Sequence, residues 1–177
     1  MTWQKLSSKT MYQNRYMTVT EDEVLTDRGD KVTYGIVHKE PFAIVIPWDG
    51  EQTVLVGQYR YAVDYFSWEF PMGHYEDVHG SVENAARAEL KEETGLTAKN
   101  LVEIGTFYLG LGHHTQKAHV FIATDLTQGE QKLEISEKGM QMKKVNLAEL
   151  ADLIKDGTIL DGPTITALKF FEFYINR

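Results

Sequence analysis

Cysteine is absent from the 177-residue sequence, and basic residues are few. The lack of cysteine excludes disulfides, thiolate metal ligands and thiol nucleophiles. Lysine and arginine number 18 against 26 aspartates and glutamates, which gives a formal net charge of −8 at pH 7. This balance argues against binding to a nucleic-acid backbone, which needs a basic face. An anionic small molecule stays compatible with it, because a bound divalent cation can invert the local field.

Long apolar runs are also missing. No stretch approaches the roughly 18 to 20 apolar residues that a membrane span needs. The first five residues contain no apolar run of the signal-peptide type. We therefore expect a soluble, cytoplasmic protein without a membrane partner. The length fits one domain, or one domain with a small accessory sheet.

The first 40 residues alternate between polar and apolar side chains and predict a small antiparallel sheet. Strand-like segments cover residues 16–20, 23–26 and 32–37, with a turn at 27–30 between the last two. A boundary near residues 40–41 separates this N-terminal β-sheet subdomain (1–40) from a main domain (41–177). So small a sheet is marginally stable alone, so we expect it to pack on the main domain or on a second subunit.

The main domain reads as a mixed α/β fold. Strands are predicted at residues 42–46, 53–60, 67–71, 101–108, 118–124 and 141–145, and helices at 81–94, 147–155 and 163–174. A loop is expected from residue 73 to residue 80. Strands interrupted by one helix, with further helices at the end, favour a mixed α/β sandwich over a regular βαβ series.

The first predicted helix carries the most informative pattern. Ser81 is a good N-cap and Gly95 a good C-cap. At 100° per residue, one sector of this helix is apolar, comprising Val82, Ala85, Ala86 and Leu90. Glu89 and Glu93 project into the middle of that sector, and Glu92 lies on its border.

Two carboxylates one turn apart on a core-facing stripe are costly unless they are neutralised. A divalent cation is the simplest partner, and hard oxygen ligands suit Mg²⁺ or Mn²⁺. The alternative is that Glu89 and Glu93 are ordinary helix formers on a solvated face. However, the opposite face of the helix is already polar, with Asn84, Arg87 and Lys91.

Residues 73–96, GHYEDVHGSVENAARAELKEETGL, resemble the Nudix box, G-x5-E-x7-R-E-U-x-E-E-x-G-U, where U is aliphatic. Residues 56–61 and 68–73 resemble the segments that precede the box in ADP-ribose pyrophosphatases and related nucleoside-diphosphate-sugar pyrophosphatases. The N-terminal sheet and residues 145–168 resemble the same group, so the similarity covers nearly the whole chain.

The resemblance implies a Nudix α/β/α sandwich with an N-terminal antiparallel β-sheet. It further implies Mg²⁺ as cofactor, with Mn²⁺ as a possible substitute. The matching metal ligands are Glu89 and Glu93, with Glu92 auxiliary and the main-chain carbonyl of Met72 contributing.

The same resemblance implies a small nucleotide-sugar substrate. Arg60 matches a substrate-contacting position, and we assign Glu69 to substrate binding with it. The group also exchanges its N-terminal sheet across a homodimer, so a homodimer is expected here.

This sequence departs from the box in ways that affect activity more than folding. Ala88 replaces the box arginine and Gly80 its first glutamate, and the loop after Gly73 is one residue longer. Losing both charges together leaves neither one buried and unpaired, so the fold should survive. Loss of their support for the metal ligands can cost roughly ten- to a hundredfold in affinity or activity.

The general base is a separate question. Gln116 and Gln141 stand where the group often carries glutamate. Glu137 is the nearest carboxylate in that region and our candidate base, with a helix glutamate such as Glu93 as the other. Glu137 can also be read as a plain solvated loop residue.

The leading hypothesis is Mg²⁺-dependent hydrolysis of the diphosphate bond in ADP-ribose or a related nucleotide sugar. The alternative is a weakly active or inactive Nudix protein that binds a nucleotide, which the losses at Gly80 and Ala88 favour. A third reading, an isopentenyl-diphosphate isomerase-like enzyme, would require a catalytic cysteine that the chain lacks.

Overall fold

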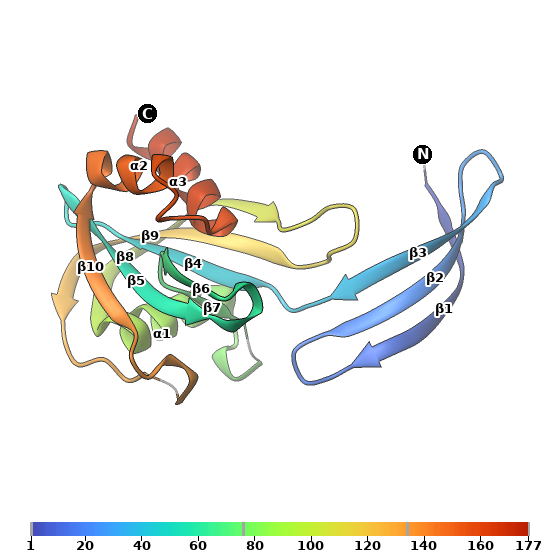
Figure 1. Cartoon of the computed structure of the whole chain (residues 1–177), viewed down its shortest axis with the longest axis horizontal. Helices are drawn as coiled ribbons and strands as arrows, with labels where there is room; N and C mark the ends of the chain where they lie inside the picture. The colour runs from blue at the N-terminus through green and yellow to red at the C-terminus, as the bar shows by residue number, and fades with distance from the viewer. Residues whose placement is uncertain (1, 76, 134, 177) are drawn as a thin grey trace. The chain divides into compact units, whose positions relative to one another are not determined.

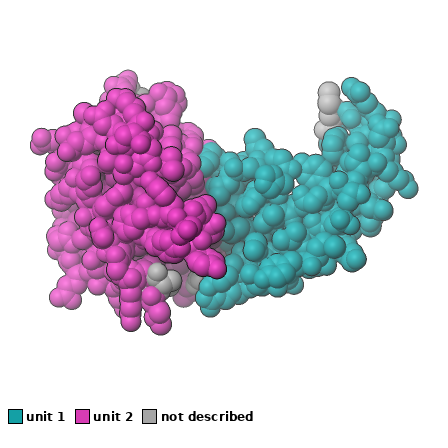
Figure 2. All heavy atoms as spheres, viewed as in Figure 1, with its two compact units in different colours: residues 1–41, 107–117 teal, residues 42–106, 118–177 magenta. Residues whose placement is uncertain are grey.

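The computed structural model of the chain describes residues 2–75, 77–133 and 135–176. The chain divides into two compact units (Figure 2). Unit 1 comprises residues 1–41 and 107–117, and unit 2 comprises residues 42–106 and 118–177. Among the described residues, no helix has the length and apolar character needed to cross a membrane.

Unit 1 is built on a three-stranded antiparallel sheet in the order β1 (Gln4–Gln13), β2 (Thr18–Leu25) and β3 (Lys31–His38). The predicted turn at residues 27–30 is confirmed. The predicted division of the strands is wrong, because residues 16–20 and 23–26 contribute to one strand, β2. Strand β1 was not predicted at all. All ten of its residues are exposed, so it has no buried face to produce a hydrophobic alternation.

Unit 2 has two sheets. One contains β10 (Gln141–Asn146), β5 (Gln52–Arg60) and β6 (Tyr65–Glu69), and the other contains β7 (Met72–His74), β4 (Phe42–Pro47), β9 (Lys117–Gln128) and β8 (Leu96–Tyr108). Helix α1 (Val82–Thr94) lies on one side of the two sheets. Helices α2 (Leu147–Lys155) and α3 (Gly162–Ile175) lie on the other side (Figure 1). The predicted mixed α/β sandwich is confirmed.

The segment predicted as a loop from residue 73 to residue 80 is partly ordered into regular structure. Strand β7 pairs antiparallel with β4, with Gly73 opposite Ala43, and a 3₁₀ turn, η2, covers Asp77–His79. A strand of three residues is too short to show a hydrophobic period, which explains why the sequence did not reveal it.

Strand β4 lies at the centre of the core, and all six of its residues are buried. Ala43 and Val45 pack with Ala86 and Leu90 of α1. Because side chains alternate along a strand, the isoleucines of β4 point to the opposite face, where α3 packs. A continuous apolar run is typical of a strand covered on both faces. Strand β4 therefore gives α1 and β7 a rigid base.

Candidate functional site

Helix α1 has the bounds that its caps predict. The Ser81 hydroxyl accepts a hydrogen bond from Asn84 N–H at 3.1 Å, and Gly95 ends the helix at φ 73°. Arg87 pairs with Glu83 at 3.0 Å on the solvent side, so it does not take the place of the missing box arginine. The fully buried residues of the helix are Ala85, Ala86, Leu90, Glu93 and Thr94. A glutamate thus lies among the core-facing positions.

The last carbonyls of α1 are satisfied by the last residue of β9 and by the segment that follows it. Lys132 N–H donates to Glu92 O at 3.0 Å, and the Gln131 amide donates to Glu93 O at 2.5 Å. The Gln128 amide donates to Thr94 O at 3.0 Å. Carbonyls at a helix end otherwise lack partners. These bonds fix the backbone that carries Glu93 and attach residues 128–132 to it.

Glu93 is the most strongly perturbed acid of the site. Its residue is 2% exposed, and its Oε2 accepts a hydrogen bond from Met72 N–H at 3.0 Å. Burial raises the pKa of Glu93 well above its usual value, and the charge of Glu89 raises it further. The Met72 N–H acts against both effects. Glu93 is therefore costly as an isolated anion in this environment.

Glu89 lies directly against the main chain of β7. A Cβ added to Gly73 would come within 1.7 Å of Glu89 Oε1, so the carboxylate occupies the space that glycine leaves open. Two carboxylates and the Met72–Gly73 main chain thus meet at one place. Sequence periodicity anticipated that Glu89 and Glu93 share a face, but not this main-chain contact.

This arrangement fits a hard divalent cation. In the described part of the chain, no three His, Asp or Glu side chains are grouped closely enough to hold a metal by themselves. Mg²⁺ is usually held by one or two carboxylates, with water and substrate oxygens completing its octahedral shell. Glu89, Glu93 and a nearby main-chain carbonyl are a donor set of that kind.

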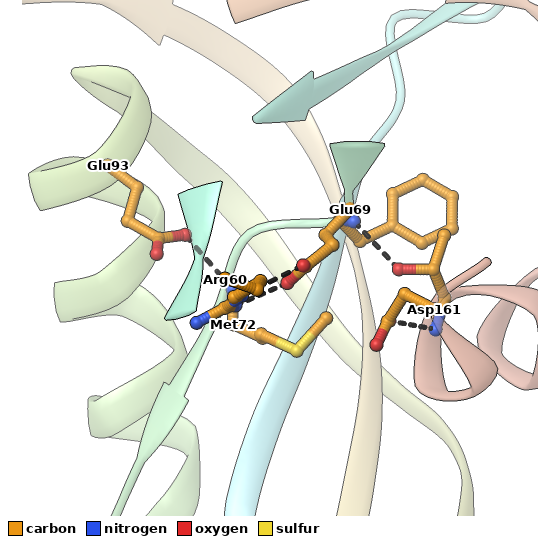
Figure 3. Close-up of polar contacts among 7 residues, drawn as sticks. Arg60, Glu69, Met72, Glu93 and Asp161 are labelled. Atoms are coloured by element: carbon orange, nitrogen blue, oxygen red, sulfur yellow. Dashed lines mark hydrogen bonds and ion pairs between the residues drawn. The ribbon is translucent and has the colours of Figure 1, made fainter. Parts of the chain in front are cut away.

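Arg60 and Glu69 form an ion pair between the ends of β5 and β6 (Figure 3). Arg60 Nε donates to Glu69 Oε1 at 2.9 Å, and Arg60 Nη2 donates to Glu69 Oε2. The Glu69 side chain is 3% exposed but that of Arg60 is 40% exposed, so the guanidinium still reaches solvent. Its hydrogen bonds to Glu69 raise the pKa of Arg60, although burial opposes this. The sequence placed both residues near the substrate, and the structure joins them directly.

Asp161, which the sequence did not single out, belongs to the same group of charges. It is the N-cap of α3, and its Oδ2 accepts from Thr164 N–H at 2.8 Å. Burial raises the pKa of Asp161, and the charge of Glu69 raises it further. Figure 3 shows Glu93 reaching in from α1 and Asp161 from the start of α3, with Arg60 and Glu69 between them. The Asp-Gly-Pro-Thr sequence marks a helix start, but no local signal places it beside Arg60.

The remaining predicted residues lie close to this group. Glu137 belongs to the 3₁₀ turn η3 (Ile135–Glu137) and is partly buried. Its charge contributes to the raised pKa of Glu93, so the two carboxylates are within electrostatic reach. Glu92 is half-buried on the border of the core-facing sector, as its position on the helix predicts.

The departures from the Nudix box have structural correlates. Gly80 adopts φ 71°, a left-handed conformation that favours glycine, and a Cβ there would meet open space. The first box glutamate is therefore replaced by a backbone turn before Ser81.

The two glutamines that replace glutamates of the group have different surroundings. In unit 1, Gln116 is 2% exposed, and its amide donates to Glu40 O at 3.2 Å. Gln141 is exposed on β10 and pairs with Gly57.

Known proteins resemble this chain along most of its length. It is 27% identical over 169 residues to the ADP-ribose pyrophosphatase of Bacillus subtilis, covering 94% of this chain and 91% of that protein. It is also 27% identical over 172 residues to the CMP-5'-(N-acetyl-N-hydroxy-3-aminopropyl)phosphonate hydrolase of Streptomyces rubellomurinus, covering 95% and 82%. A crystal structure of an ADP compounds hydrolase has the same fold, with a TM-score of 0.88 at 20% identity over 99% of this chain and 95% of that one.

Two family models match successive parts of the sequence. The Nucleoside diphosphate sugar hydrolase N-terminal domain matches residues 3–37, and the NUDIX domain matches residues 38–168. The second match covers well over half of the chain and includes α1, β7 and the Arg60–Glu69 pair. The chain therefore belongs to the Nudix family.

Proposed function

We propose that this protein is a Mg²⁺-dependent hydrolase that cleaves the diphosphate bond of a nucleoside diphosphate linked to another group, with ADP-ribose or a related nucleotide sugar as substrate. The observation that carries the proposal is the meeting of Glu89 and Glu93 with the β7 main chain beside Arg60. The names of the relatives support cleavage of a nucleotide-linked phosphate. They differ in substrate, so the base and the leaving group are proposals.

Glu89 and Glu93 would hold the cation, with Glu92 auxiliary and the Met72 carbonyl as a main-chain donor. Mn²⁺ would substitute, since it accepts the same oxygen ligands. A bound Mg²⁺ supplies charge neutralisation at the phosphoryl oxygens and lowers the pKa of coordinated water. The raised pKa of Glu93 supports this assignment, because a cation offsets the cost of ionising that buried group.

Arg60 would bind a phosphate oxygen or the terminal ribose of the substrate. Glu69 holds the guanidinium through Nε and Nη2, so that Nη1 lies outside the pair and is available to a ligand. If the Arg60–Glu69 ion pair served only the structure, both side chains could be fully buried. The Arg60 side chain is instead 40% exposed, and it lies between Glu69 and Glu93 (Figure 3).

Glu137 would accept the proton of the attacking water. Residues 128–132, which precede η3 in the sequence, are attached to the end of α1 by the bonds described above. A general base must lie within hydrogen-bond reach of the water that it deprotonates, directly or through one other water. The electrostatic coupling of Glu137 to Glu93 supports that role.

Unit 1, taken by itself, contains a hollow of a kind that suits a nucleotide base. A hollow of about 430 Å³ in this unit is lined mainly by polar residues, among them Arg15, Tyr16, His38 and Lys39. The Tyr16 ring is 60% exposed, with the Arg15 guanidinium carbon 4.4 Å from its centroid. An exposed aromatic ring among cationic groups suits a base joined to phosphates. The volume lies within the range of small-molecule sites.

The subdomain of residues 1–40 would act as a dimerisation element for the hydrolase domain of residues 41–177. The subdomain exposes large apolar residues that a single copy does not cover, including Trp3 and, on β1, Leu6, Met11 and Tyr12. Where such side chains gather on one face, they are typical of interaction sites. Light scattering should give twice the monomer mass of 20.2 kDa. A monomeric mass would overturn this part of the proposal.

The test of the activity is a substrate panel with Mg²⁺ and with Mn²⁺. It should include ADP-ribose, GDP-mannose, UDP-glucose and diadenosine polyphosphates, with the Glu93→Gln variant assayed beside the wild type. Turnover that depends on the metal and falls at least about a hundredfold in the variant would support the proposal. Tight nucleotide binding without turnover would instead establish the alternative, a ligand-binding Nudix protein, which the changes at Gly80 and Ala88 favour.

A further inference from the structure

We propose that Thr164, on the first turn of α3, is a positioning residue for the metal site and holds the main chain that leads to Met72. The inference rests on the proposed function, because it assumes that the site binds a divalent cation. Thr164 lies 94 residues from Phe70 and outside the Nudix box.

The chain from Phe70 to Met72 is fixed at three consecutive residues by three different elements. Thr164 Oγ1 accepts from Phe70 N–H at 3.0 Å. Pro71 O accepts from Val45 N–H of β4 at 2.9 Å, and Met72 N–H donates to Glu93 at 3.0 Å. Pro71 has no N–H of its own, so the Phe70 bond is the last donor contact before Met72.

Burial makes the Thr164 contact important. Both Phe70 and Thr164 are 0% exposed. A buried main-chain N–H without an acceptor is strongly disfavoured, so loss of the hydroxyl would force the segment to move or to admit water. Movement at Phe70 would reach Met72 within two residues. It would displace both the carbonyl proposed as a metal ligand and the N–H bound to Glu93.

Thr164 is itself held firmly. Its N–H donates to Asp161 Oδ2 at 2.8 Å in the N-cap of α3, where a proline at the helix start limits backbone freedom. The hydroxyl is therefore presented by a rigid turn, as a positioning contact requires.

The experiment compares three substitutions at one position. Thr164→Val keeps the shape and removes the acceptor, Thr164→Ala removes the acceptor together with the γ-methyl group, and Thr164→Ser retains the acceptor. Phe171→Leu is the control, because it truncates a fully buried side chain about two turns further along α3, away from the bond between Thr164 and Phe70. The readout is the dissociation constant for Mn²⁺ alone, measured from the electron paramagnetic resonance signal of the free ion. The melting temperature of each protein is recorded with it.

The valine and alanine variants should bind Mn²⁺ about tenfold more weakly, as expected for lost support of a metal ligand. The serine variant should stay within about twofold of wild type, since it still accepts the bond. Phe171→Leu should lower the melting temperature and leave Mn²⁺ affinity unchanged. If the valine variant does not fold, the alanine variant decides.

Three results would overturn the inference: unchanged affinity in the alanine variant, failure of serine to preserve it, or equal weakening by Phe171→Leu. A wild-type protein that binds no Mn²⁺ would overturn the proposed function itself. The two failures are therefore distinguishable.

Discussion

Glu93 Oε2 accepts a hydrogen bond from Met72 N–H at 3.0 Å, in a site where the glutamate is 2% exposed. This contact joins the end of α1 to β7 and sets one carboxylate beside the main chain. A single N–H compensates only part of the cost of burying an anion next to Glu89. The ionised Glu93 therefore destabilises the metal-free protein, and removing the charge of this side chain should increase its stability.

Glu93→Gln should stabilise the metal-free protein at neutral and alkaline pH. The pKa of Glu93 is raised in the folded protein. Its contribution to the stability of the fold is therefore fully present below the ordinary pKa of glutamate, and it is lost as the pH rises through the folded-state pKa. Glutamine keeps an acceptor for Met72 N–H but carries no charge. The melting temperature in EDTA should rise by a few degrees at about pH 8, since roughly 1 kcal/mol shifts it by about 2–4 °C in a chain of this size.

The difference in melting temperature between Glu93→Gln and wild type should shrink as the pH falls toward the ordinary pKa of glutamate, because the side chain at position 93 is then uncharged in both proteins. Glu83→Gln, on the exposed side of the same helix, is the matched control and should show no such stabilisation. A lower melting temperature for Glu93→Gln at every pH would contradict the expectation.

Gly73→Ala should disrupt the metal site. The new Cβ would fall within 1.7 Å of the Glu89 carboxylate, which must then leave its position. Displacing one of two carboxylates should weaken Mn²⁺ binding by at least about tenfold. Gly112→Ala is the control, because its Cβ meets open space and its φ is not left-handed. Equal Mn²⁺ affinities for the two variants in a titration would contradict metal binding by Glu89 at its position against Gly73.

The features that could be predicted from the sequence are those marked by helix caps, by helical periodicity or by a continuous apolar run. The bounds of α1 follow from Ser81 and Gly95, and the core-facing position of Glu93 follows from helical geometry. The fully buried strand β4 follows from an uninterrupted apolar run. In each case the evidence lies within a few turns of helix or one strand, where spacing alone decides which side is buried.

Features that depend on distant contacts or on no period were not predictable. Strand β1 is exposed along its whole length, and β7 is only three residues long. Asp161 and Thr164 enter the site because the first turn of α3 docks on the chain after β6, about 90 residues earlier in sequence. No helix or strand pattern encodes such a contact, and a helix-capping sequence reports only the start of its own helix.

Arg60→Gln should separate substrate binding from stability. Without the guanidinium, the buried Glu69 loses its cation, and the free energy of unfolding should fall by about 1–3 kcal/mol, limited by the partial exposure of Arg60. KM should rise more than kcat falls, since a phosphate contact acts on substrate and transition state alike. Urea unfolding and steady-state kinetics measure the two effects.

The double variant Arg60→Gln/Glu69→Gln provides the matching test. It removes the unpaired charge, so it should recover part of the lost stability. It should not recover KM, because the cation that binds substrate is still missing. Recovery of KM in the double variant would show that Arg60 serves only to neutralise Glu69.

Glu137→Gln tests the general base. If Glu137 takes the proton of the attacking water, kcat should fall by about 10²- to 10⁴-fold. Substrate KM and Mn²⁺ affinity should change little, because the residue holds neither ligand. Glu130→Gln, at an exposed position of the same segment, should keep full activity. An unchanged kcat in Glu137→Gln would assign that residue to the solvated surface and return the role to a glutamate of α1, with Glu93 the first to examine.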